Sequence, residues 1–210
     1  MRSSRTTLVL ATIMWGVNGM RTRLVAPPWG APRLTPEAQD MVETLADNVW
    51  GEAAVSFYAS RDALLRAGRR APKGMQKTLN NVIQQRLTSS GWEGDSGYFF
   101  KGRTWVRVTF RHQMSLGSDI IDALKVCRKE GMELAVILAA GTETLKTISP
   151  NDCNALVSFE KLRNEVFDLD GALDIPLVIG ELIPSSTPPQ AIVDELRKER
   201  LRDMTVPRMR

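Results

Sequence analysis

Residues 98–110 read YFFKGRTWVRVTF, a pattern that predicts a β-hairpin. Two short runs rich in aromatic and β-branched residues flank Lys101-Gly102-Arg103, which is a turn signal. Side chains alternate along a strand, so the second strand has an apolar face that is expected in the core: Val106, Val108 and Phe110. The opposite face is expected to meet a cleft or solvent, and it carries Trp105, Arg107, Thr109 and Arg111.

The segments on either side of this hairpin predict further strands and helices. Residues 134–139 form an uninterrupted apolar run that is typical of a buried central strand, and residues 175–182 predict a closing strand. Helical spacing of apolar residues predicts helices over 35–49, 52–67, 76–87, 119–129 and 156–169. The side chains expected inside on the helix over 119–129 are Ile120, Ile121, Leu124 and Cys127. The predicted fold class is α/β, a mixed sheet with helices on both faces.

Both ends of the chain are expected to lie outside the main domain, which we predict over residues 35–183. Residues 1–34 comprise an N-terminal segment and a proline-rich connector, and residues 184–210 comprise a linker and an amphipathic helix over 190–204. The apolar run 6–17 resembles a weak secretion signal, but no small-residue cleavage site follows it. The alternatives are a packed N-terminal segment and translation that starts at Met20.

The composition excludes several classes of protein. The chain has 210 residues, 43% hydrophobic content and a net charge of +4, which fits a globular domain and permits an acidic partner such as nucleic acid. His112 is the only histidine, and Cys127 and Cys153 lack zinc-ligand spacing, so a histidine-based zinc site is excluded. No apolar run is long enough to span a membrane, and we expect a cytoplasmic protein with two inert thiols.

The order of these features resembles the BglII/BamHI branch of type II restriction endonucleases, within the PD-(D/E)XK nuclease superfamily. The resemblance covers residues 76–182, from the helix before the hairpin to the closing strand. It implies a restriction-endonuclease-like sheet, and a homodimer or a heteromeric subunit that binds double-stranded DNA. In the family, an aspartate opens the hairpin, and a glutamate and a second polar residue stand two positions apart on its second strand, where they help to bind Mg²⁺.

This chain departs from the family at those positions, which are occupied by Tyr98, Arg107 and Thr109. Magnesium needs anionic oxygen ligands, whereas the forked guanidinium of Arg107 suits a phosphate. The resemblance therefore implies a DNA-binding protein with a degenerate metal site and no bound metal, such as a subunit of a restriction or defence system. The residues predicted to bind DNA are Lys101, Arg103, Arg107, Arg111 and His112.

Two alternative functions stay open. An active Mg²⁺-dependent endonuclease would need carboxylates from elsewhere in the chain, and the candidates are Glu93 and Asp95, with Glu133 or Glu160 as further ligands. A protein-interaction module would have kept the fold and lost the binding of DNA.

Three further features each have a structural and a functional interpretation. Residues 68–74, GRRAPKG, form a basic loop that is either a solvated turn or a phosphate contact. Asn81 and Gln85 are either solvent-exposed amides or weak ligands of the family site. His112 is either a hydrogen-bonded structural residue or a general base.

Overall fold

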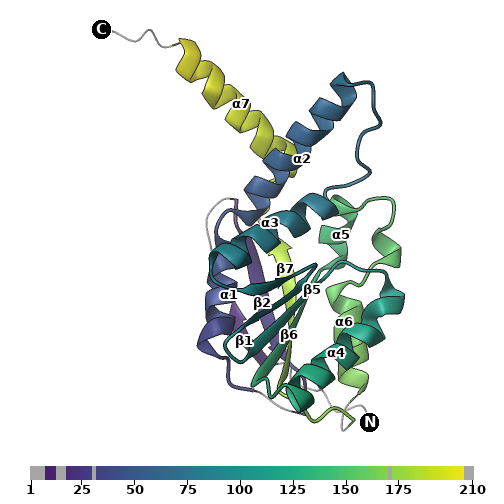
Figure 1. The fold of residues 1–210 in the computed structure, drawn as a ribbon. Coiled ribbons are helices and arrows are strands. Elements are labelled where there is room, and N and C mark those ends of the chain that lie inside the picture. The colour runs from purple at the N-terminus through teal and green to yellow at the C-terminus, as the bar shows by residue number, and fades with distance from the viewer. Residues whose placement is uncertain (1–7, 13–17, 30–31, 170–171, 206–210) are drawn as a thin grey trace.

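A seven-stranded mixed sheet forms the centre of the computed structural model, which describes residues 8–12, 18–29, 32–169 and 172–205 (Figure 1). The strands lie in the order β1-β2-β7-β6-β5-β4-β3. Their bounds are β1 Leu8–Thr12, β2 Met20–Ala26, β3 Glu93–Asp95, β4 Tyr98–Lys101, β5 Thr104–Thr109, β6 Leu134–Ala140 and β7 Leu177–Pro184. The central strands β5, β6 and β7 are parallel, and the remaining pairs are antiparallel.

The predicted hairpin and central strand are confirmed. Strands β4 and β5 pair with Tyr98 opposite Arg107, and all seven residues of β6 are buried. Parallel strands that are covered on both faces read as continuous apolar runs, which is why residues 134–139 show no alternation.

Helices cover both faces of the sheet, as the sequence predicts. Their bounds are α1 Pro36–Ala46, α2 Val49–Arg66, α3 Gln76–Ser89, α4 Leu116–Lys129, α5 Thr142–Ile148, α6 Phe159–Asp168 and α7 Pro189–Thr205. One apolar cluster joins the sheet to α1, α2, α3, α5 and α7, and a second joins it to α4 and α6. Alternate residues of β6 supply the two clusters: Val136 and Leu138 face the first, and Ile137 and Ala139 face the second.

The N-terminal boundary predicted at residue 34 does not separate an appendage from the sheet. Strand β2 pairs antiparallel with β7 from Met20 to Val25, and β1 pairs with β2. Met20 and Leu24 belong to the main core, and the pairing of residues 8–12 as β1 agrees with a packed N-terminal segment. Residues 6–7 and 13–17 of the apolar run that resembles a secretion signal lie outside the described residues.

The predicted C-terminal helix is present as α7 and docks on α2. Ile192 and Val193 are buried, and Trp50 of α2 donates a hydrogen bond from Nε1 to the carbonyl of Thr187 at 3.1 Å. Helices α2 and α7 extend together beyond the end of the sheet at which β7 finishes (Figure 1). Within the described ranges, no helix is both long enough and apolar enough to cross a bilayer.

The prediction that the second face of β5 meets a cleft or solvent is wrong, because α4 covers it. Every residue of β5 is buried, and Trp105 packs in the cluster that contains α4 and α6. The buried stripe of α4 also differs from the predicted one, since Ile121 is 52% exposed. The α4 residues that face inward are Leu116, Asp119, Ile120, Ala123 and Val126.

Candidate functional site

A buried carboxylate and two arginines meet between β5 and α4. Asp119 is fully buried, and its Oδ1 accepts hydrogen bonds from Arg107 Nε and Arg111 Nη1, each at 3.0 Å. Its Oδ2 accepts from Thr109 Oγ1 at 2.8 Å. Arg107 is only 2% exposed, whereas the side chain of Arg111 is 42% exposed. The cluster therefore pairs one negative charge with two positive charges, and its surplus charge reaches solvent through Arg111.

Tyr98 completes this cluster from β4. Its ring lies 3.6 Å from the guanidinium carbon of Arg107, close enough for a cation–π contact. Its hydroxyl donates to Asp122 Oδ2 at 3.3 Å and accepts from Arg111 Nη1 at 3.4 Å. Tyr98, Arg107 and Thr109, the three residues that the sequence analysis compared with the endonuclease pattern, are therefore neighbours in the structure.

Local backbone geometry holds Arg107 in place. The turn before β4 has positive φ at Ser96 (49°) and Gly97 (86°), and the Ser96 carbonyl accepts from Arg107 Nη1 at 3.0 Å. A side chain at Gly97 would put its Cβ 2.5 Å from the carbonyl oxygen of Val108, so only glycine fits there. The guanidinium is thus fixed by a carboxylate, a carbonyl and an aromatic ring.

The residues of this cluster do not fit a magnesium ion. A hard divalent cation needs several free oxygen ligands, usually with more than one carboxylate. Asp119 is the fully buried carboxylate of the cluster, and both of its oxygens accept hydrogen bonds from protein donors. Asp122, which Tyr98 contacts, is partly exposed and is ion-paired with Lys125. The guanidinium of Arg107 is a permanent cation that repels a metal ion and offers no lone pair to it.

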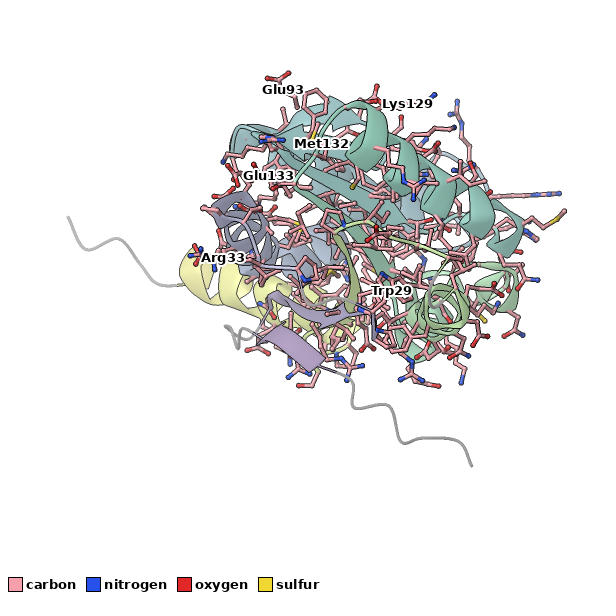
Figure 2. The ribbon with its side chains drawn as sticks, turned by 90° about the horizontal axis from the view of Figure 1, so that it is seen from below. Trp29, Arg33, Glu93, Lys129, Met132 and Glu133 are labelled. Carbon is pink, nitrogen blue, oxygen red and sulfur yellow. The ribbon has the colours of Figure 1, made fainter. Side chains whose placement is uncertain are left out.

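The carboxylates that could have rebuilt a metal site do not converge. Glu93 and Asp95 are exposed on the edge strand β3. Glu133 forms an ion pair with Arg103 at 2.6 Å. Figure 2 shows Glu93 pointing outward at the end of the molecule that also carries Glu133. Among the residues that the structure describes, no group of three or more potential metal ligands of the types Asp, Glu, His and Cys occurs.

Glu160 lies instead at the carboxyl end of the parallel strands. Its carboxylate accepts from the Thr142 amide at 3.1 Å and from the Thr142 hydroxyl at 2.8 Å. Burial works to raise the pKa of Glu160, but hydrogen bonds from its own backbone, from Thr142 and from Ser158 outweigh it and hold that pKa below its ordinary value. Glu181 also approaches Gly141 there and is ion-paired to Arg23.

The five residues predicted to bind DNA do not form one surface. Lys101 and Arg103 lie in the β4–β5 turn, where Lys101 binds Asp40 at 2.9 Å and Arg103 binds Glu133. Arg107 is buried. Arg111 and His112 follow the other end of β5, about 20 Å away at 3.3 Å per residue. His112 is exposed, and its Nδ1 accepts from the Met114 amide at 3.4 Å.

Asp119 is the site residue that the sequence analysis missed. It lies three residues after Leu116 and four before Ala123, so it falls on the buried stripe of α4. An aspartate in the first turn of a helix is ordinarily interpreted as a partner of the helix dipole. The sequence pattern therefore gave no sign that Asp119 binds the two arginines. Cys127 lies on the same helix, and burial raises the pKa of its thiol to about 11, which disfavours the reactive thiolate.

Comparisons with known proteins find solved structures whose backbone partly resembles the backbone of this chain. No protein-family model matches the chain, and no curated protein matches it. The restriction endonuclease BglII in complex with a DNA 16-mer is similar, with 22% identity, a TM-score of 0.41, and coverage of 50% of this chain and 53% of that chain. Free BglII is similar with 18% identity, a TM-score of 0.43, and coverage of 71% and 72%. The chain thus matches about half the length of the DNA-bound endonuclease, and these likenesses do not transfer its activity.

Proposed function

We propose that this chain is a DNA-binding protein with a restriction-endonuclease-like fold that does not cleave DNA. The observation that carries the proposal is the buried ion pair between Arg107 and Asp119. In the endonuclease family that the sequence resembles, a metal-binding carboxylate stands at the position of Arg107. The guanidinium balances the charge of Asp119, and both oxygens of that carboxylate are engaged by protein donors, so it is not free to bind a metal ion or activate water.

Double-stranded DNA is the proposed partner. A polyanion is bound chiefly through cations that contact its phosphates, and the chain carries a net charge of +4. Arg111 offers an exposed guanidinium at the carboxyl end of β5, an end at which α/β sheets commonly bind ligands. That the protein is a homodimer or a heteromeric subunit, that it serves a restriction or defence system, and that it is cytoplasmic stay predictions.

A plasmid binding and cleavage assay tests the proposal. The protein is incubated with plasmid at low and moderate salt, in EDTA, Mg²⁺ or Mn²⁺, and each sample is divided between a native gel and a denaturing digest. We expect retarded but intact plasmid under every metal condition. Arg111→Ser should weaken binding by about 8-fold near 0.1 M salt, the value of one lost phosphate contact, while Arg128→Ser should bind as the wild type does.

Two outcomes would contradict the proposal. Discrete fragments with Mg²⁺ that disappear in EDTA would establish an active endonuclease, and Glu160→Gln and Glu181→Gln would then test the carboxylates near Gly141. Plasmid that is not retained even at low salt would favour the protein-interaction module. Arg107→Ala is unsuited to this assay, because removing a buried ion-pair partner perturbs folding.

A further inference from the structure

The region from the end of α2 through α3 is basic without interruption. No acidic residue occurs between Asp62 and Glu93, whereas six basic residues do: Arg66, Arg69, Arg70, Lys73, Lys77 and Arg86. Arg86 is neutralised by ion pairs with Glu52 and Asp47. Among the described residues, no carboxylate is ion-paired to the other five, and all five are exposed.

The loop that carries these cations has a defined conformation. Gly68, at φ 67°, ends α2, and the amide of Arg69 binds the carbonyl of Leu64 at 2.9 Å, which is the bond of a Schellman motif. At the other end, a Cβ on Gly74 would lie 2.3 Å from the carbonyl oxygen of Ile148, so the loop packs closely on the end of α5. Both ends of the loop are thus anchored, and its basic side chains lie between these two anchors.

Helix α3 continues this surface with uncharged polar groups. The residues on its outer side are Asn80, Asn81, Gln84, Gln85 and Thr88, and no hydrogen bond engages their side chains within the described residues. From Lys77 to Thr88 the row is about 16 Å long at 1.5 Å per residue. Shallow cavities of about 350 Å³ and about 490 Å³ lie along it, and Asp152 is the carboxylate that lines the first.

The basic loop lies at the same end of the sheet as Arg111. Gln76, the first residue of α3, donates from Nε2 to the carbonyl of Phe110 at 2.8 Å, and Phe110 directly precedes Arg111. Figure 1 shows the loop descending from the tip of α2 to the start of α3, beside α5. The cations of the loop and the exposed guanidinium of Arg111 therefore lie at the same end of the molecule, and together they make that end positively charged.

We propose that the segment 66–77 and the outer face of α3 form the surface that grips duplex DNA, an inference that rests on the proposed function. The loop cations contact phosphates, and these contacts position the duplex on the protein without recognising its base sequence. The amides of α3 then face a groove, where asparagine and glutamine side chains match the donor and acceptor edge of adenine. The surface is assigned to duplex DNA because five unpaired cations complement a polyanion, and because an amide row suits base edges.

A charge-matched pair of triple variants tests this surface. The first is Arg69→Ser, Arg70→Ser and Lys73→Ser in the loop, and the control is Arg128→Ser, Lys129→Ser and Arg163→Ser on α4 and α6. The six residues are exposed, and each triple removes the same three charges. Helix α4 ends at Lys129, and it runs toward the end of the sheet that lies away from the loop (Figure 1). Fluorescence anisotropy of a labelled DNA duplex gives the binding constant at several salt concentrations, and thermal melting checks that both variants fold.

The loop variant should reduce the slope of log K against log salt by about 2.7, which is three contacts at 0.9 each, and should lose as much as about 500-fold in affinity at 0.1 M salt. The control should keep the wild-type slope. Equal losses in both variants, or an unchanged slope in the loop variant, would overturn the inference while the proposed function stands. A wild type that binds no DNA duplex would overturn both, and tighter binding to an RNA duplex would reject the assignment to DNA.

Discussion

Replacing Asp119 by alanine should destabilise the protein strongly. The substitution removes the acceptor for three hydrogen bonds, from Arg107, Arg111 and Thr109. Arg111 can turn to solvent, but the Arg107 guanidinium stays buried with only the Ser96 carbonyl and the Tyr98 ring as partners. Breaking a buried ion pair by removing one partner costs about 3–5 kcal/mol, which is a large share of the stability of a typical domain.

Urea unfolding and thermal melting measure this cost. With about 2–4 °C lost per kcal/mol for a chain of this size, the melting temperature of Asp119→Ala should fall by about 6–20 °C. The double variant Arg107→Met with Asp119→Leu removes both charges and should recover most of the loss. Glu133→Gln breaks the exposed pair with Arg103, whose side chains are 54% and 64% exposed, and should cost less than about 1 kcal/mol.

A loss of less than about 1 kcal/mol in the free energy of unfolding of Asp119→Ala would contradict this expectation, because a desolvated guanidinium would then be tolerated without its partner. A double variant that is no more stable than Asp119→Ala would contradict it as well. The salt dependence gives an independent check, since high salt should weaken the Arg103–Glu133 pair far more than the buried pair.

Two smaller perturbations test the surroundings of the cluster and the carboxyl end of the sheet. Tyr98→Leu should cost about 1–2 kcal/mol in urea unfolding more than Tyr98→Phe, because phenylalanine keeps the ring over Arg107; equal losses would exclude the cation–π contact. The lowered pKa of Glu160 stabilises the protein above the ordinary value of 4.5, and this stabilisation is lost as pH falls through the lowered folded pKa. Melting temperatures across this acid range should therefore fall less steeply for Glu160→Gln than for the wild type, and parallel curves would contradict the assignment.

Local sequence patterns correctly predicted those strands and helices whose conformation is set by residues close together in the sequence. The alternation in residues 104–110, the apolar run of β6 and the spacing in α3 each specify an element without knowledge of its partners. Strand β2 also alternates, with Met20, Thr22 and Leu24 buried, but its pairing with β7 joins segments about 160 residues apart. Nothing local to residues 20–26 indicates that pairing, and an apolar N-terminus is readily taken for a signal.

The sequence drew attention to three residues of the cluster but not to their surroundings. The departures at Tyr98, Arg107 and Thr109 are visible in the sequence, and the structure brings these residues together. Their environment depends on which face of α4 packs on β5, and the hydrophobic pattern of α4 placed that face about one residue away from its actual position. A shift of one residue is a rotation of about 100° about the helix axis, and it turns Asp119 toward Arg107.

Under the proposed function, an arginine in place of a metal-binding carboxylate would preserve electrostatic balance while removing chemistry. A carboxylate site that binds a metal is balanced by an exchangeable divalent cation, whereas the cation that balances Asp119 belongs to the chain and is present at any metal concentration. A guanidinium has no open coordination position and does not release its proton near neutral pH, so it cannot activate water. The cluster nevertheless has an excess of positive charge, which Arg111 carries to the surface beside the start of α3. A site of this kind can stabilise the fold and attract a phosphate backbone, and these are the two properties that a non-cleaving DNA-binding protein requires.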